Sequence, residues 1–207
     1  MKRRINPETK RRIFHICSGL AAVGLIYFGI LTPLILIIIL VIGGILSVLS
    51  LKYKLPVFYW LLKHLDRPQD MKTFPGKGSF YYVLGILLSL VLFDKDIAMA
   101  SIMIMALGDS VAPLVGHYYG QIKHPLSDKK FLEGTIAGGI AAFLGAWAIL
   151  SITGTIISNA AIQAVFASIA AMIVEGINIK FSGISVNDNI SMPVVAGLII
   201  LLLRLIL

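Results

Sequence analysis

One acidic residue of this chain, Asp109, lies inside a strongly apolar stretch, where an ionised carboxylate is costly unless it is paired or bound to a metal ion. Gly108 precedes it and Pro113 follows it. Both residues weaken a continuous helix, so we expect the segment to break there and to line a polar cavity. Gly116 and Gly120, four residues apart, would let a phosphate or another backbone approach closely. The same spacing also suits a helix-packing face, which remains the alternative interpretation.

A second polar segment, Lys129 to Gly134, comes just before another apolar run. Lysines such as Lys130 hold phosphate oxygens as point charges, and a carboxylate such as Glu133 can bind the magnesium that accompanies them. Glu133 could instead be a first-turn acid that faces the positive end of a helix dipole. The lysines could equally be ordinary topology signals of a membrane protein.

A third acidic segment precedes the last apolar run. Asp188 and Asn189 supply oxygens for a metal ion and donors for a nucleotide, and Glu175 lies near the end of the apolar run before them. Asp188 or Asn189 could equally be only the N-cap of the last helix. The presence of Asp109 and Glu133 elsewhere in the chain is what favours a functional interpretation.

Two basic segments complete the set of candidate residues. Arg12 and His15 are three residues apart, which places them on one face of the first predicted helix, although a lone histidine near the membrane interface is more often structural. Residues 74–79 form a glycine-rich turn containing Lys77, which could cradle a phosphate through backbone amides. The turn lacks the Gly-Lys-Ser/Thr ending of a Walker A loop, so the chain is not a P-loop enzyme.

These polar residues must be held in place by membrane helices. The chain has 207 residues, is 58% hydrophobic and has a mean hydropathy of +0.93, which is too apolar for an ordinary soluble domain. A membrane span needs about 20 mostly apolar residues. The pattern predicts an all-α, polytopic membrane helix bundle that forms a single catalytic domain over residues 1–207. About seven transmembrane helices are expected, at Ile13–Ile30, Pro33–Leu51, Phe80–Phe93, Ile97–Val115, Thr135–Ile152, Asn159–Ile177 and Ile190–Leu207.

The positive charges predict the orientation of this bundle. Sixteen of the eighteen Lys and Arg residues fall in the N-terminal segment or in the longer polar connections: Lys2, Arg3, Arg4, Lys10, Arg11, Arg12, Lys52, Lys54, Lys63, Arg67, Lys72, Lys77, Lys123, Lys129, Lys130 and Lys180. Only Lys95 and Arg204 fall on the opposite side. We therefore expect a cytoplasmic N-terminus and a site that faces the cytoplasm. Because the net charge of +8 is spread between apolar runs, it argues against a nucleic-acid partner. The single cysteine, Cys17, excludes an intrachain disulfide.

Taken in this order, the segments resemble the CTP-dependent lipid kinase family, which includes dolichol kinase, phytol kinase and the CTP-using diacylglycerol kinase, and which is related to the phosphatidate cytidylyltransferases. The resemblance rests on Arg11–His15, Gly76–Tyr82 with Gly85, Gly108–Asp109 with Ala112, Gly116 and Gly120, Lys130 with Glu133–Gly134, and Asp188–Asn189 with Pro193 and Gly197. The chain departs from the family at Phe131, where serine is usual, and at Asn187, where a second aspartate is common.

The resemblance implies transfer of the γ-phosphoryl group from CTP to the hydroxyl of a membrane isoprenoid alcohol of the dolichol or polyprenol type, or of a related lipid alcohol, with Mg²⁺ as divalent cation. It implies that Asp109, Glu133 and Asp188 are catalytic and hold the metal, and that one of them, Asp109, could instead orient or deprotonate the lipid hydroxyl. The implied nucleotide contacts are Arg12, His15, Lys77, Gly108, Gly116, Gly120, Lys130, Gly134 and Asn189.

Two other functions fit the same residues. In cytidylyl transfer, a lipid phosphate would attack the α-phosphate of CTP with the same carboxylates and metal. A small transporter would also keep Asp109, Glu175 and broken helices near the membrane, although it would not need long basic loops on one face only.

Overall fold

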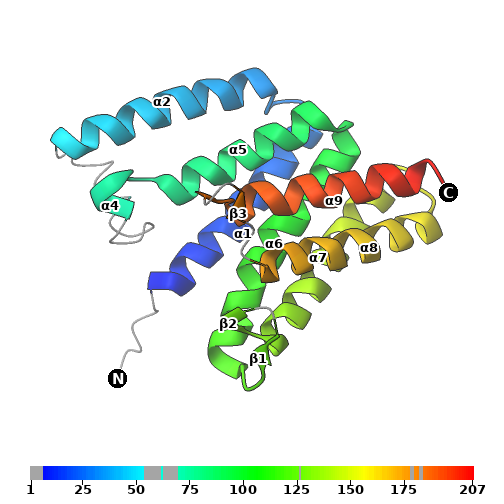
Figure 1. Ribbon diagram of the computed structural model, residues 1–207. Helices are drawn as coiled ribbons and strands as arrows, with labels where there is room; N and C mark the ends of the chain where they lie inside the picture. Colours follow the sequence, from blue (N-terminus) through cyan, green and yellow to red (C-terminus); the bar gives the residue numbers. More distant parts are fainter. Residues whose placement is uncertain (1–6, 54–61, 63–69, 126, 178–179, 182–183) are drawn as a thin grey trace, which may run out of the picture.

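The computed structural model describes residues 7–53, 62, 70–125, 127–177, 180–181 and 184–207. Helices dominate this part of the chain (Figure 1). The long ones are α1 (Pro7–Tyr27), α2 (Pro33–Lys52), α5 (Lys77–Leu92), α6 (Lys95–Tyr119), α7 (Leu132–Ile152), α8 (Ile157–Gly176) and α9 (Asp188–Arg204). One further short helix, α4 (Asp70–Thr73), precedes α5. Each of the seven apolar ranges expected to span a membrane therefore coincides largely with one long helix.

Four of these helices are long and apolar enough to cross a membrane, namely α2, α6, α7 and α8. The protein is thus an all-α bundle with several candidate membrane spans. Helix α5 is apolar but shorter. Spanning by α1, α5 and α9 and the cytoplasmic position of the N-terminus remain predictions. Of the basic residues used for orientation, Lys2, Arg3, Arg4, Lys54, Lys63 and Arg67, and the side chains of Lys129 and Lys180, lie outside the described residues.

Helix α6 passes through the middle of the bundle and is the most buried of the four candidate spans (Figure 1). It packs against α1, α5, α7, α8 and α9. The expected break between Gly108 and Pro113 does not occur, because α6 continues from Lys95 to Tyr119 with Pro113 inside it. A proline leaves the carbonyl four residues earlier without its helical donor. That carbonyl belongs to Asp109, and it accepts a hydrogen bond from Arg12 Nη1 at 2.6 Å instead.

Glycines allow α6 and α7 to cross at very close range. A Cβ atom on Gly134 would lie 2.3 Å from the carbonyl oxygen of Ala112 and 3.0 Å from the Cα atom of Gly116. A Cβ atom on Gly138 would lie 2.8 Å from that of Ala112. The small residues of both helices therefore form one packing face, which agrees with the packing interpretation of the Gly-xxx-Gly spacing.

The variant Gly134→Ala is expected to destabilise the bundle by about 1–3 kcal/mol, because the new methyl group overlaps backbone atoms of α6 that cannot move aside. Unfolding of the detergent-solubilised protein in a denaturant titration measures the change. The matched control is Gly24→Ala in α1, where no atom lies within 4 Å of the added Cβ position. Equal midpoints for both variants would contradict the close crossing.

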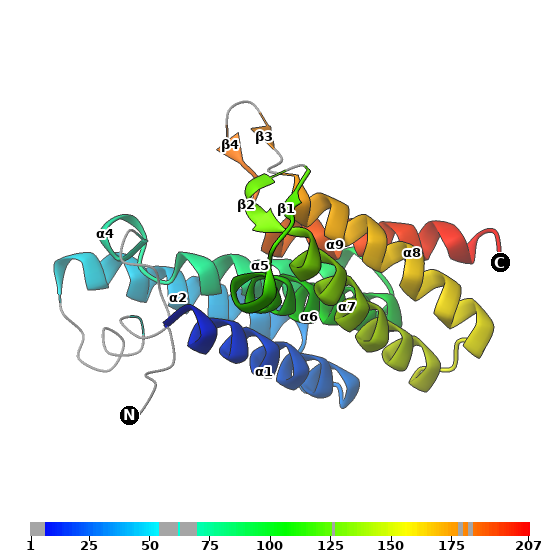
Figure 2. The same ribbon diagram turned by 90° about the horizontal axis from the view of Figure 1, so that it is seen from below.

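Two short antiparallel hairpins join the helices at one end of the bundle (Figure 2). Strands β1 (Lys123–His124) and β2 (Ser127–Phe131) connect α6 to α7, with Lys123 opposite Phe131. Strands β3 (Lys180–Phe181) and β4 (Ile184–Ser185) connect α8 to α9. The N-termini of α1, α7 and α9 and the C-termini of α6 and α8 meet at this end.

The opposite end of the bundle carries a separate set of polar contacts. Arg204 forms an ion pair with Asp96, and Lys95 donates a hydrogen bond to the carbonyl of Tyr27 at 2.9 Å. Lys95 and Arg204, the two cations that the charge pattern assigned to the other side, thus lie together at the other end. The alternating direction of successive helices therefore gathers the candidate residues at the hairpin end.

Candidate active site

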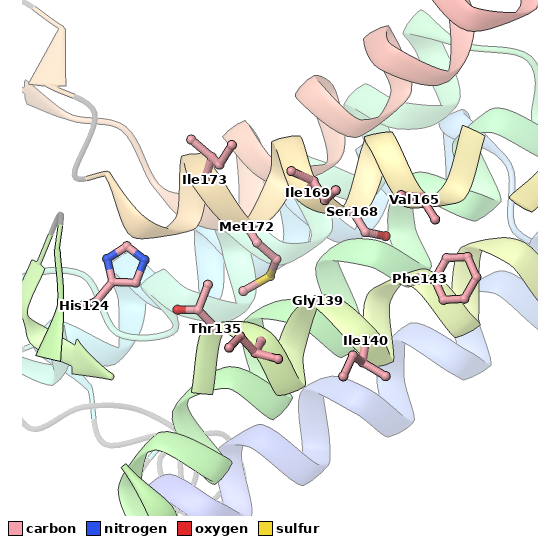
Figure 3. Close-up of a pocket in the computed structure, with 11 residues that line it drawn as sticks. His124, Thr135, Gly139, Ile140, Phe143, Val165, Ser168, Ile169, Met172 and Ile173 are labelled. Carbon is pink, nitrogen blue, oxygen red and sulfur yellow. The ribbon is translucent and has the colours of Figure 1, made fainter. Parts of the chain in front are cut away.

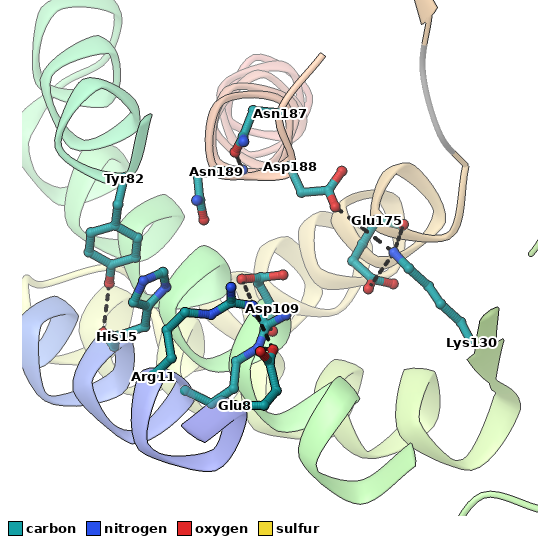
Figure 4. A network of polar contacts seen from close by, with 11 residues as sticks. Glu8, Arg11, His15, Tyr82, Asp109, Lys130, Glu175, Asn187, Asp188 and Asn189 are labelled. Carbon is teal, nitrogen blue, oxygen red and sulfur yellow. Dashed lines mark hydrogen bonds and ion pairs between the residues drawn. The ribbon is translucent and has the colours of Figure 1, made fainter. Parts of the chain in front are cut away.

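A polar pocket of about 490 Å³ opens at the hairpin end, between α1, α6, the β1–β2 hairpin, α8 and α9. Figure 4 shows the charged residues that line it converging from these elements. The lining residues are Glu8, Thr9, Arg12, Asp109, Ala112, Pro113, Leu114, Gly116, His117, Ser127, Lys130, Phe131, Thr135, Glu175 and Asp188.

Arg12 and Asp109 form a buried ion pair on one side of the pocket. Both residues are 8% exposed, and Arg12 Nη1 lies 2.5 Å from Asp109 Oδ2. The Nε atom of Arg12 donates to Glu8 Oε1 at 3.0 Å, and Arg11 contacts the same oxygen at 2.5 Å. Glu8 and Arg12 are four residues apart on α1, the spacing at which helical side chains meet. Arg12 is therefore held by carboxylates from two helices.

Lys130 organises the other side of the pocket. Its Nζ atom lies 2.6 Å from Glu175 Oε1 and 3.9 Å from Asp188 Oδ2, and it also donates to the Glu175 carbonyl. Glu175 is 3% exposed, and its Oε2 atom is buried without a hydrogen-bond partner. The hairpin thus brings one ammonium group to two carboxylates from α8 and α9, one of which has an unused oxygen.

The pocket carries more negative than positive side chains. Among the side chains that the structure describes, its lining contains four carboxylates, Glu8, Asp109, Glu175 and Asp188, against two cations, Arg12 and Lys130, a formal excess of two negative charges. Burial raises the pKa of Asp188 to about 6; Lys130 opposes this shift, and the carboxylates of Asp109 and Glu175 add to it. A polyphosphate could enter such a pocket only together with cations.

The pocket contains five of the residues expected from the sequence, namely Arg12, Asp109, Gly116, Lys130 and Asp188. It does not contain Glu133, whose carboxylate accepts a hydrogen bond from the Ile122 amide at 3.0 Å. Glu133 therefore links the segment before β1 to the start of α7 through this hydrogen bond. Among the residues that the structure describes, no three His, Cys, Asp or Glu side chains form a metal-binding group, so the expected cluster of Asp109, Glu133 and Asp188 is not seen.

Three expected nucleotide contacts are glycines that pack against protein instead. A Cβ atom on Gly108 would lie 3.1 Å from Met172 Sδ, and Gly134 lies against α6. A Cβ atom on Gly120 would lie 2.3 Å from Phe131 Cγ, because the Phe131 ring covers this glycine. The aromatic ring in place of the family's usual serine thus fills space where a phosphate was expected to approach.

Lys77 is also outside the pocket. Its side chain is exposed at the start of α5, and the preceding Gly76 caps that helix with a φ of 85°, a conformation that glycine adopts readily. Pro75 and Gly76 line an apolar pocket with Leu62. The glycine-rich turn therefore starts a helix.

His15 and Asn189 lie beside the pocket, on the side of Asp109 toward Tyr82 (Figure 4). The His15 ring packs against the ring of Tyr82 at 4.7 Å between centroids, and the Tyr82 hydroxyl donates to the His15 carbonyl at 2.9 Å. His15 Nδ1 and Asn189 Oδ1 are buried without hydrogen-bond partners. Two unused polar atoms therefore remain close to the buried carboxylate.

Two carboxylates that are not among the predicted catalytic and metal-binding residues line the observed pocket. Glu175 is, like Asp109, an acid within an apolar run, and that property alone was sufficient to select it. Glu8 precedes Arg12 by four residues, a spacing that favours an ion pair. Neither signal shows which distant residue each acid will face.

The variant Glu133→Gln is expected to retain activity within about threefold, because the amide oxygen can still accept from Ile122 and the residue does not line the pocket. Glu175→Gln, which has the same change of charge inside the pocket, is the comparison and should lose activity about 10²-fold or more. Activity assays of the purified variants measure both. A loss as large for Glu133 as for Glu175 would restore Glu133 to the active site.

The pocket fits a divalent cation. Mg²⁺ in nucleotide sites is usually held by one or two carboxylates together with substrate phosphates. Asp188 and Glu175 approach the same Lys130 ammonium group from two helices, and Glu175 has a buried oxygen without a partner. These two carboxylates are the ones best placed to share such an ion.

Comparisons with known proteins agree with this chemistry. The chain is 30% identical over 196 residues to an uncharacterized protein of Methanocaldococcus jannaschii, with 93% of this chain and 92% of that protein covered. It is 28% identical over 149 residues to CTP-dependent diacylglycerol kinase 1 of Saccharomyces cerevisiae, covering 68% of this chain and 49% of that kinase. It is 30% identical over 208 residues to phytol kinase 1, chloroplastic, of Arabidopsis thaliana, covering 91% and 64%.

The chain therefore spans about half to two thirds of the length of these two kinases. No family model matches the chain, and no solved structure matches it significantly.

Proposed function

Because the chain belongs to the family of CTP-dependent polyprenol and lipid kinases, we propose that it transfers the γ-phosphoryl group of CTP to the hydroxyl group of a membrane lipid alcohol. The observation that carries the proposal is the pocket in which the buried Arg12–Asp109 pair faces the Lys130–Glu175–Asp188 cluster. An isoprenoid alcohol of the dolichol or polyprenol type is the first acceptor to test. Phytol and diacylglycerol, the acceptors in the names of the relatives, come next.

Phosphoryl transfer depends mainly on positioning and on neutralising charge. Lys130 and Arg12 are cations that line the pocket, and each can donate to phosphate oxygens once CTP enters. Asp188 and Glu175 would hold Mg²⁺, with Asp109 nearby. When bound, this ion neutralises phosphate charge and fixes the orientation of the triphosphate.

Asp109 is suited to act on the acceptor. Its position about ten residues from the end of α6 places it about 15 Å along the helix from Tyr119. A lipid hydroxyl that reaches this depth would meet the Asp109 carboxylate, which can orient it and accept its proton. Arg12 keeps this carboxylate in one position through its contacts with both the side chain and the carbonyl.

The proposed arrangement also suits the location of the substrates. We place the pocket at the cytoplasmic side of the membrane, where water-soluble CTP is available and lipid hydroxyl groups lie at the interface. The continuous α6 lacks the broken helix that would favour a transporter.

Product analysis tests the proposed function. The purified protein is incubated with Mg²⁺, with CTP or ATP labelled at the α- or γ-phosphate, and with dolichol, geranylgeraniol, phytol or a diradylglycerol. A kinase moves the γ-label to the lipid and releases CDP. Label from the α-phosphate in the lipid, with release of pyrophosphate, would show a cytidylyltransferase instead, and no labelled lipid with any acceptor would overturn both.

The raised pKa of Asp188 predicts how the stability of the ligand-free protein depends on pH. The native carboxyl keeps its proton up to about pH 6, whereas the ordinary value is 3.8. Between these values the native state holds more protons than the unfolded state, so stability falls as the pH rises through this window and is constant above it. Thermal unfolding at pH 4–7 measures the change, and Asp188→Asn should lack this component.

Cation binding should depend on pH in the opposite direction to the stability of the ligand-free protein, because a bound cation favours the ionised carboxylate of Asp188. The affinity for CTP with Mg²⁺ is therefore expected to rise with pH up to about 6 and then to level off. Equal affinity at pH 5 and pH 7 would show that Asp188 does not contribute to cation binding.

A further inference from the structure

An apolar groove of about 370 Å³ runs between α7 and α8, next to the polar pocket. Figure 3 shows Met172 projecting from α8 toward α7, with His124 and Thr135 at one end of the groove. Among the residues that the structure describes, no Asp, Glu, Lys or Arg side chain lines it. The lining residues are His124, Thr135, Ile136, Gly139, Ile140, Phe143, Val165, Ser168, Ile169, Met172 and Ile173.

The groove leads directly into the polar pocket. Thr135 lines both spaces, and its hydroxyl lies 3.4 Å from the Phe131 carbonyl, close to the start of α7. On α8, Met172 lines the groove, and Glu175, three residues later on the same face, lines the pocket. The apolar side chains of α7 and α8 therefore lead directly to the carboxylate and ammonium groups of the polar pocket.

The length and the outer edge of the groove match a hydrocarbon chain. From Thr135 to Phe143, and from Val165 to Ile173, the groove follows eight helical steps, about 12 Å. Isoleucines at its edges, such as Ile140 and Ile169, are about half exposed. Both helices are candidate membrane spans, so this edge would face lipid. Such a groove can hold the first part of a long chain and leave the rest in the bilayer.

We propose that the α7–α8 groove binds the part of the lipid alcohol chain nearest its hydroxyl group and directs that hydroxyl past Thr135 into the polar pocket, which Asp109 also lines. This inference rests on the proposed function, since it names the path by which the acceptor reaches the site. It implies that the affinity for the acceptor rises with chain length up to about 12 Å and then becomes constant.

Gly139 allows the groove to be filled without disturbing the backbone. A Cβ atom there would meet only Met172 Cγ, at an ordinary 3.6 Å. Gly139→Leu should raise the KM for a long-chain alcohol about tenfold or more, because it displaces several methylene groups, and should leave the KM for CTP unchanged. Gly24→Leu, at an open position on α1, is the matched control and should change neither constant. An unchanged KM for the alcohol in Gly139→Leu would overturn the proposal.

Fluorescence gives a second measurement that does not require turnover. The chain has two tryptophans, and in a Trp60→Phe background only Trp147 remains, whose ring stacks on Phe143 at the far end of the groove, 5.9 Å between centroids. A long-chain alcohol brominated along its chain, added to nanodiscs of unbrominated phospholipid, should quench Trp147. Gly139→Leu should remove most of this quenching, and Gly24→Leu should not.

The two measurements separate failure of the groove from failure of the proposed function. Quenching that is equal in the Gly139→Leu and Gly24→Leu variants means that the chain contacts the protein only as bulk lipid, and the proposal is wrong. Absence of phosphorylated product from the unmodified protein rejects the kinase function, whereas the quenching experiment still decides whether the groove holds an alcohol chain.

Discussion

Asp109→Asn is expected to lower kcat by about 10²–10⁴-fold, which is the range for loss of a group that accepts a proton in the transition state. The amide has nearly the shape of the carboxylate and keeps an oxygen that can accept from Arg12 Nη1, which also donates to the Asp109 carbonyl. Arg12 Nε keeps its hydrogen bond to Glu8. The variant loses the negative charge that would orient and deprotonate the lipid hydroxyl. The helix bundle should therefore remain folded while turnover is lost.

The matched control for this variant is Asp96→Asn. It removes the same charge from an ion pair with Arg204 at the opposite end of the bundle. Its activity should stay near that of the unmodified protein, and the denaturation midpoints of both variants show whether each is folded. Near-normal turnover by folded Asp109→Asn would remove Asp109 from the mechanism.

Lys130→Met is expected to affect stability and activity together. It leaves Glu175, which is 3% exposed, without its cation. Removing one partner of a buried ion pair destabilises a protein by about 3–5 kcal/mol. It also removes one of the two cations that could hold the phosphates, so kcat/KM for CTP should fall about 10²–10³-fold.

A second substitution separates the two effects. Glu175→Gln in the Lys130→Met background neutralises the unpaired carboxylate, so most of the lost stability should return. Activity should not return, because the double variant lacks both the phosphate-binding cation and the Glu175 carboxylate, so this variant tests the effect on stability only. Lys95→Met, at the other end of the bundle, controls for loss of a lysine in general. Near-normal kcat/KM for CTP in the Lys130→Met variant, measured under conditions in which that variant is folded, would show that Lys130 has only a structural role.

The apolar runs predicted the positions of the helices well, because a run of about 20 apolar residues has to satisfy its backbone groups within itself. The alternating direction of successive helices also predicted which residues lie at the same end of the bundle. Asp109 was a candidate because a charged group inside an apolar run needs a partner, whereas the site roles of Lys130 and Asp188 rested on the family resemblance. Contacts between these residues depend on the rotation of each helix about its axis. A helix with apolar residues on every side gives no sequence signal for that rotation.

Particular residues show where this limit lies. Glu133 and Glu175 are both acids next to apolar runs, and only the path of the β1–β2 hairpin directs Glu133 to the Ile122 amide and Lys130 to Glu175. Pro113 suggested a broken helix because the sequence does not show that Arg12 would bind the carbonyl that it leaves free. The glycines suggested phosphate contact because close approach is equally useful between two helices.

The amino-acid sequence by itself therefore determined that the chain forms apolar helices, and it predicted that the candidate catalytic residues and most of the bases lie at one end of the bundle, because hydropathy and charge act locally along the chain. Only the tertiary structure decided which carboxylate faces which cation and where an apolar groove meets the polar pocket. Those contacts join residues far apart in the chain, 97 positions for Arg12 and Asp109 and 45 for Lys130 and Glu175, and they are set by the packing of small residues between helices.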